Sequence, residues 1–187
     1  MCIIGISGKA ESGKTTFGNM LKESFEAEGQ RVVMINYADA VKYIAKQYYG
    51  WNGEKDEYGR SLLQQIGTER GRQSFSEDVW ILTVNMFINV MKKDFDIFII
   101  GDCRFPNEVI YWKDVPNTYS IRLTREDHIS QLTEEQKQHE SETALDNFIG
   151  FDYIINNNGS LEKLKDWADS IANNILARSC NSQDFML

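Results

Sequence analysis

The chain has 187 residues and a formal net charge of −8, a length that suits one domain with a full hydrophobic core. We expect no standing nucleic-acid partner, because binding to duplexes depends on cationic contacts to phosphate. The three cysteines are far apart, which favours free thiols in a reducing compartment over a disulfide framework or a zinc site. No apolar run approaches the ~20 residues that span a bilayer and no signal-peptide pattern is present, so we expect a cytoplasmic protein without a membrane partner.

Short segments rich in β-branched or aromatic residues alternate with stretches of helical apolar spacing. The strands are predicted at residues 2–6, 32–37, 96–101, 118–123 and 153–156. Helical stripes follow the first, second and last of these, and the stripe at residues 80–91 is expected to be core. This alternation predicts a three-layer α/β fold, with a five-stranded parallel sheet and helices on both faces. Ligands on such sheets bind beyond the carboxyl ends of the strands.

The first motif follows the first predicted strand and opens a helical stretch. Residues 8–15 have a glycine, four further residues and then Gly13-Lys14-Thr15, which is the phosphate-binding P-loop pattern. Glycines let successive N–H groups point inward at a helix N-terminus, where they bind anions. Lys14 is expected between the β- and γ-phosphates of ATP, and the Thr15 hydroxyl on Mg²⁺. The expected ATP-binding set is Gly8, Lys9, Glu11, Ser12, Gly13, Lys14, Thr15 and Thr16.

The second motif joins the most apolar predicted strand to the helix after it. Asp102 closes this strand, and an acidic residue at such a position beside a P-loop commonly holds Mg²⁺, directly or through water. Arg104 is expected to reach the same crevice, where a guanidinium binds phosphate in a bidentate manner. The alternative is structural: Asp102 pairs with Arg104, and Glu108 caps the helix.

The second motif also carries a family resemblance. Gly101-Asp-Cys-Arg-Phe-Pro-Asn-Glu-Val109 resembles the Asp-x-Arg-Phe-x-Asn-Glu signature of the bacteriophage-type deoxynucleoside monophosphate kinases. Further stretches resemble this family in order, at residues 37–42, 63–72, 122–125, 139–142 and 155–161. The resemblance implies an enzyme that uses ATP and Mg²⁺ to convert deoxynucleoside 5′-monophosphates to diphosphates.

The resemblance also implies how one P-loop kinase domain, residues 1–187, is organised. The core is expected at residues 1–37, 77–124 and 150–178, with a helical substrate-binding insertion at about 38–76. A short lid is expected at about 125–143. The residues from 179 to 187 lose helical periodicity and are expected to form a loose tail.

Roles for individual side chains follow from the resemblance. The expected catalytic residues are Lys14, Asp102, Arg104, Glu108 and Arg125, with Thr15 and Asp102 on the metal. Arg125 is expected to approach the γ-phosphate when the lid closes, the alternative being a pair with Glu126 or Asp127. The expected contacts to the acceptor nucleotide are Asp39, Lys42, Arg70, Arg72 and Arg104. The choice between Arg70 and Arg72 for the acceptor phosphate stays open.

Three other kinds of protein also use a P-loop. A regulatory GTPase would carry an Asn-Lys-x-Asp segment after the fourth strand, where this chain has Thr124-Arg-Glu-Asp127. A P-loop kinase for a non-nucleotide acceptor, of the dephospho-coenzyme A or phosphomevalonate type, shares parts of the pattern. A non-enzymatic ATP-binding scaffold would bind ATP without turnover. The accepted bases and the discrimination of ribose from deoxyribose stay open, as does a homodimer formed through a helical face.

Overall fold

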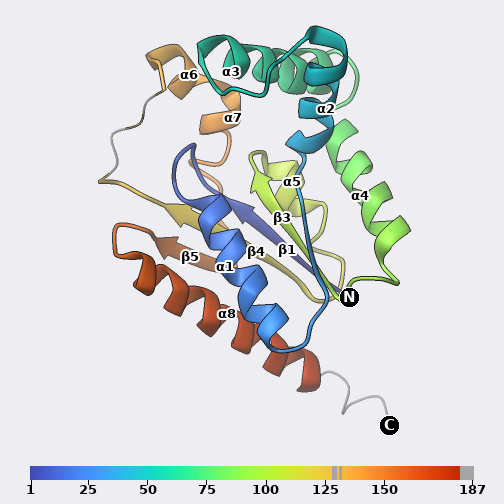
Figure 1. Cartoon of the computed structure of the whole chain (residues 1–187), viewed down its shortest axis with the longest axis vertical. Coiled ribbons are helices and arrows are strands. Elements are labelled where there is room, and N and C mark those ends of the chain that lie inside the picture. The colour runs from blue at the N-terminus through green and yellow to red at the C-terminus, as the bar shows by residue number, and fades with distance from the viewer. Residues whose placement is uncertain (128–129, 131, 182–187) are drawn as a thin grey trace.

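The expected strands all form, and they lie parallel in one sheet (Figure 1). The computed structural model describes residues 1–127, 130 and 132–181. The strand order is β2-β3-β1-β4-β5, and the bounds are β1 (Cys2–Ser7), β2 (Val32–Ile35), β3 (Ile97–Cys103), β4 (Thr118–Thr124) and β5 (Tyr153–Asn156). The three-layer α/β fold is therefore confirmed. Strand β2 ends two residues earlier than expected because the chain turns there into a helix.

The central position of β1 determines where the loops meet. In the sheet, Ser7 at the end of β1 is paired with Cys103 of β3 on one side and Arg122 of β4 on the other. The loops that follow these three strands therefore leave the same edge of the sheet. The middle of β3 is buried on both faces, which explains why its sequence is almost wholly apolar.

One face of the sheet is covered by α1 (Lys14–Ala27) and α8 (Leu161–Asn181), which lie side by side (Figure 1). Phe17 and Leu21 of α1 and Ile171 of α8 are buried in one cluster with apolar side chains of the strands. Helix α8 extends to Asn181, which corrects the expected start of the loose tail at residue 179. Once a helix is nucleated, each further residue adds a backbone hydrogen bond, so it can continue beyond its last buried side chain. Residues 182–187 lie outside the described part of the chain.

The other face is covered by α2 (Ala38–Tyr49), α4 (Val79–Met91) and α5 (Pro106–Ile110). The expectation that residues 80–91 are core is only half right. Ile81, Val84 and Ile88 pack against the sheet, whereas the opposite side of α4 is exposed, with Met86 at 55% and Val90 at 73%. A helix presents only one side to a sheet, so a largely apolar sequence does not imply burial on every side.

The remaining helices lie beyond the carboxyl edge of the sheet (Figure 1). They are α3 (Glu57–Gln64), the π-helix η1 (Gln65–Gln73), α6 (Glu134–Gln138) and α7 (Glu140–Thr143). Three residues of the expected lid, at positions 128, 129 and 131, lie outside the described residues. Within the described part of the chain, we find no helix that combines the length and the apolar character needed to cross a membrane.

Candidate active site

Residues 8–16, here called the P-loop, connect β1 to the first turn of α1. Gly13 has φ +96, and a Cβ there would lie 2.4 Å from Asn157 Nδ2, so a larger side chain would strain the backbone and displace Asn157. The same amide group donates a 2.9 Å hydrogen bond to the Ser12 carbonyl. Glu11 adopts φ +63, a conformation that is costly for a non-glycine residue and clusters at ligand-binding loops. The P-loop therefore has the tightly curled backbone that binds anions.

Polar atoms of the P-loop fit a phosphate group. Helix α1 has no acidic residue in its first turn, so its positive N-terminal end is not neutralised there. The hydroxyls of Ser7 and Ser12 are buried and have no hydrogen-bond partner among the described residues. Buried polar groups are normally paired, so these orphaned hydroxyls suit a polar ligand. Thr15 and Thr16 are exposed at the same helix end.

Lys14 is buried beneath the P-loop. Its Nζ donates hydrogen bonds of 2.7 Å to the carbonyls of Gly8 and Lys9. The pKa of Lys14 is lowered to about 7, mainly by burial and in addition by the nearby cations Arg104 and Arg122, while carboxylates oppose the shift. An anionic ligand would favour the ammonium form, because opposite charges stabilise each other.

Asp102 lies at the end of β3 and anchors the start of α2. Its Oδ1 accepts a hydrogen bond of 2.8 Å from the Tyr37 N–H, and its Oδ2 one of 3.0 Å from the Ala38 N–H. Burial raises the pKa of Asp102, and these two N–H groups act in the opposite direction. The alternative in which Asp102 forms an ion pair with Arg104 is not found, because Arg104 pairs with the carboxylate of Glu142 instead.

Glu142 lies on α7. Arg104 Nη1 donates to Glu142 Oε1 at 2.8 Å and to the Ser141 carbonyl at 3.4 Å. The second oxygen, Oε2, accepts a 2.7 Å hydrogen bond from the Ala10 N–H of the P-loop. One carboxylate thus joins the P-loop to the arginine that follows β3.

Glu108 lies at the start of α5 and is almost completely buried. Its Oε2 accepts hydrogen bonds from the N–H groups of Arg104, at 2.5 Å, and Phe105, at 3.0 Å. Its Oε1 forms an ion pair with Arg72. Burial raises the pKa of Glu108 to about 7, against the effect of Arg72 and the backbone donors. Arg72 also donates to the Glu77 carbonyl at 2.7 Å and stacks over the Phe105 ring.

The other arginine and the two polar residues expected at the acceptor are exposed or half-buried. Arg70 is exposed and donates to the Tyr49 hydroxyl at 2.6 Å and to Gln65 Oε1 at 3.2 Å. Asp39 and Lys42, on the first turn of α2, form an ion pair of 3.0 Å. Arg70 is thus accessible to a ligand, whereas Arg72 is held by internal contacts.

Two cations that the sequence did not single out lie near the P-loop. Arg60 of α3 approaches Glu11 of the P-loop at 3.6 Å. Burial lowers the pKa of Lys55, and the cations Lys42, Arg60 and Arg104 add to this effect. Positive charge therefore gathers between the P-loop and the helices of residues 38–76.

The segment after β4 contributes further charges. Arg125, the expected lid arginine, is exposed. Arg122 is more buried and lies 3.5 Å from Asp146, which also accepts a 2.8 Å hydrogen bond from Lys9 Nζ of the P-loop. Asp146 thus neutralises one P-loop lysine at the rim of the site.

Sequence reasoning missed Glu142, Asn157, Arg60 and Lys55. Glu142 and Asn157 lie in stretches that resemble the kinase family, but no spacing rule assigned either of them a partner. Arg60 and Lys55 lie outside both motifs and outside the stretches that resemble the kinase family, and we find no sequence signal that would have identified them.

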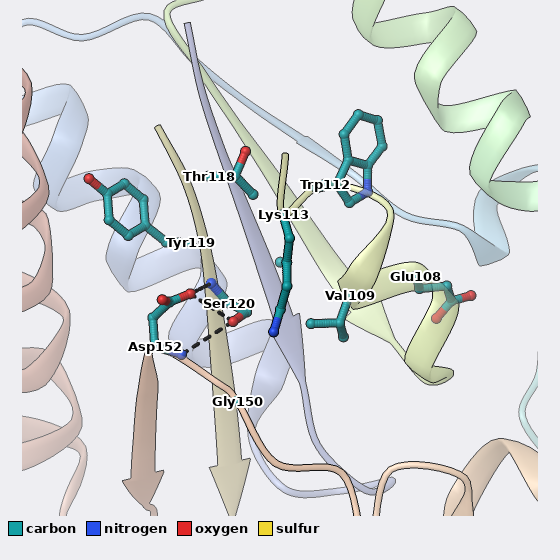
Figure 2. Close-up of a pocket in the computed structure, with 10 residues that line it drawn as sticks. Glu108, Val109, Trp112, Lys113, Thr118, Tyr119, Ser120, Gly150 and Asp152 are labelled. Atoms are coloured by element: carbon teal, nitrogen blue, oxygen red, sulfur yellow. Dashed lines mark hydrogen bonds between the residues drawn. The ribbon is translucent and has the colours of Figure 1, made fainter. Parts of the chain in front are cut away.

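A cavity of about 230 Å³ is lined by Glu108 and Val109 of α5 and by residues of β4 (Figure 2), and its described lining residues include none of the P-loop. Figure 2 shows Ser120 and Asp152 at the cavity wall, where they are hydrogen-bonded to each other. Of the residues expected in the active site, Glu108 is the one that lines this cavity. The candidate active site is thus the cationic edge around the P-loop, not this cavity.

Comparisons with known proteins bear on the family and the fold of the chain. The family model for deoxynucleotide monophosphate kinase matches residues 30–167. A deoxynucleoside-5′-monophosphate kinase of Escherichia phage T5 is 43% identical over 49 residues, which is 26% of this chain and 19% of that relative. The chain therefore aligns with less than a quarter of the length of this curated relative.

Solved structures share the fold at low identity. A sugar kinase from Janibacter sp. HTCC2649 superimposes with a TM-score of 0.52 at 12% identity, over 90% of this chain and 92% of that one. The protein APE1195 gives a TM-score of 0.50 at 12% identity, over 92% and 95% of the two chains. These likenesses establish the fold, and the family follows from the sequence model. Since that model matches well over half of the chain, the protein belongs to the deoxynucleotide monophosphate kinase family.

Proposed function

We propose that this protein phosphorylates deoxynucleoside 5′-monophosphates to diphosphates, with ATP as the donor and Mg²⁺ as the metal. The observation that carries this proposal is the bridge between the P-loop and Arg104 at the edge of the sheet, where Glu142 accepts hydrogen bonds from the Ala10 N–H and from Arg104 Nη1. Lys14 Nζ donates to the Gly8 and Lys9 carbonyls of the same loop, so Lys14 and Arg104 are both held at this edge. Such a pair of cations suits a reaction that brings two phosphate groups together.

The donor side of the reaction is assigned to the P-loop. Its N–H groups would bind the phosphates of ATP, with Lys14 reaching the transferring group. The expected loop contacts are Gly8, Lys9, Glu11, Ser12, Gly13, Lys14, Thr15 and Thr16. Thr15 and Asp102 would hold Mg²⁺, Asp102 through water because its oxygens already accept backbone hydrogen bonds. The metal, when bound, would neutralise charge on the phosphates.

The acceptor side is assigned to the cations around Arg104. A phosphate monoester is mostly dianionic near pH 7, since its second pKa is about 6, so it needs little help from a base. Catalysis then depends on positioning and on cationic stabilisation of the transferred group. In this proposal the insertion, residues 38–76, contributes Asp39, Lys42 and Arg70 to the acceptor. Arg72 acts through Glu108, which holds the backbone of residues 104 and 105.

The remaining part is the lid, residues 125–143 in this proposal. Arg125 is exposed at its start, so it is free to turn toward a γ-phosphate when the lid closes. A closed lid would exclude water, which protects ATP from hydrolysis.

The test is ADP release from ATP and Mg²⁺ with dAMP, dGMP, dCMP or dTMP supplied separately, against a blank without acceptor. We expect ADP that depends on the acceptor and is matched by deoxynucleoside diphosphate. The Lys14→Ala protein should lose this activity by orders of magnitude, with a thermal midpoint close to that of the wild type. If none of the four acceptors increases ADP release, although the protein still binds ATP, the deoxynucleotide proposal is refuted.

A further inference from the structure

The carboxylate of Glu142 occupies an unusual position between two phosphate-binding elements. Its two oxygens have different partners: Oε1 accepts from Arg104 Nη1 at 2.8 Å, and Oε2 accepts from the Ala10 N–H at 2.7 Å. The side chain is 9% exposed, so these contacts are shielded from water. Charge-assisted hydrogen bonds in such surroundings are stronger and more directional than those at the surface.

The surroundings of Glu142 explain why a carboxylate is needed there. Lys14 of the P-loop and Arg122 of β4 are near enough to feel its charge, in addition to Arg104. Three cations of the site thus share this anion at the edge of the sheet. Without it, the guanidinium of Arg104 would be repelled by the other two cations and would lose its fixed position.

We propose that Glu142 is a positioning residue for phosphoryl transfer, which holds the guanidinium of Arg104 at a fixed place relative to the P-loop. This inference rests on the proposed function, in which the P-loop binds the donor and Arg104 binds the acceptor phosphate. Transfer requires the two phosphates to be in line and nearly in contact, so an element that sets the distance between their binding groups controls the rate.

The bridge needs both carboxylate oxygens. A glutamine at position 142 has one oxygen, which can accept from Ala10 or from Arg104 but not from both in the observed arrangement. Its NH₂ group would then face a donor, either the guanidinium or the backbone N–H. Glu142→Gln therefore removes the bridge while changing the volume of the side chain very little.

The experiment measures steady-state kinetics of Glu142→Gln with the best deoxynucleotide acceptor, together with ATP binding by calorimetry in the absence of acceptor. We expect kcat/KM for the acceptor to fall by ~10- to 100-fold, because small misplacements of a positioning group cost this much. The dissociation constant of ATP should stay within a factor of about three, since the P-loop itself is intact.

Two further variants show whether the effect passes through Arg104. Arg104→Lys loses the bidentate fork, and adding Glu142→Gln to it should cause little further loss, because the two residues act as a unit. Glu26→Gln is the matched control: it removes an exposed carboxylate that pairs with Lys22 on α1, outside the site, and all kinetic constants should stay unchanged. If Glu142→Gln folds poorly, Glu142→Asp replaces it in the same measurements. The aspartate keeps the charge but is too short to bridge both partners, so the same loss of kcat/KM is expected.

The outcomes separate this inference from the proposed function. Wild-type protein without acceptor-dependent turnover overturns both. Turnover in the wild type with unchanged acceptor kinetics in Glu142→Gln overturns the positioning role alone. Tighter ATP binding in Glu142→Gln would also overturn it, because Glu142 would then be a competitor of the donor phosphates. Losses that multiply in the double variant would show that Glu142 acts independently of Arg104.

Discussion

At the residue scale, Lys14 shows how the P-loop prepares for an anion. The ammonium is held by two loop carbonyls, yet burial and neighbouring cations lower its pKa from 10.5 to about 7. At pH values between about 7 and 10.5, the protein without ATP therefore binds fewer protons than it would with a lysine of ordinary pKa. A triphosphate beside Lys14 would favour the charged form and raise the pKa again.

We therefore expect ATP binding to take up ~1 proton at pH 8, and the affinity to fall as the pH rises above 7. Calorimetry at pH 8 in two buffers that differ in ionisation enthalpy measures this uptake. In Lys14→Arg the uptake should vanish, because a guanidinium stays charged at this pH. Equal heats of ATP binding in both buffers for the wild type would contradict the lowered pKa of Lys14.

Glu108 and Arg72 give a second prediction for single residues. Both side chains are buried, with 3% and 7% exposed, so removing one charge leaves the other without a counter-ion. Arg72→Met should lower the free energy of unfolding by about 3 kcal/mol, the lower end for a broken buried pair, because the ionised Glu108 then stays buried without its counter-ion. Urea unfolding at pH 8 tests this, above the pKa of about 7 of Glu108.

The matched control for Arg72→Met is Lys22→Met. Glu26 pairs with Lys22 on the exposed side of α1, where solvent screens the interaction. The urea midpoint of Lys22→Met should not move measurably. Equal midpoints for the two variants would mean that the Arg72 pair is no more important than a surface pair.

At the scale of elements, the strands were predictable and several contacts between elements were not. The apolar run of β3 and the motifs at Lys14 and Arg104 are local signals, readable within about ten residues. The bond between Ala10 and Glu142 joins residues 132 positions apart, and it depends on where α7 lies. Likewise, the exposed side of α4 could not be separated from its buried side, because both carry large apolar residues.

The π-helix η1 is another element that the sequence did not predict. It carries Arg70 and Arg72, and its backbone passes close to the ring of Trp80. A Cβ on Gly71 would lie 2.6 Å from Trp80 Cζ2, and the ring is fixed by a 2.8 Å hydrogen bond from its Nε1 to the Gly67 carbonyl. A glycine is thus required at position 71 by close packing.

Gly71→Ala should therefore destabilise the protein by about 1–3 kcal/mol, the usual cost of overpacking. Gly67→Ala is the same change in the same helix, but its Cβ would make an ordinary contact of 3.6 Å with Val41. It should be neutral or slightly stabilising, because alanine favours a helix more than glycine does. Thermal unfolding compares the two, and an equal drop in both would show that helix geometry, not Trp80, restricts position 71.

At the scale of the whole molecule, charge is distributed unevenly. The net charge of −8 would repel a nucleotide, whereas Lys42, Lys55, Arg60 and Arg104 form a local cationic region near the P-loop. Which effect dominates depends on distance. At 0.1 M salt the Debye length is about 10 Å, so the distant acidic surface is largely screened while contacts within the site are not.

Raising KCl from about 0.1 M to about 0.5 M should therefore increase KM for the acceptor several-fold, because it weakens the short-range attraction that remains. The kcat should change less, since salt ions screen charged groups only weakly once substrate fills the site. Lys55→Gln removes one exposed cation of this region and should reduce the dependence of KM on salt. A KM that falls with added salt would mean that repulsion by the acidic surface, and not the cationic region, governs how the acceptor reaches the site.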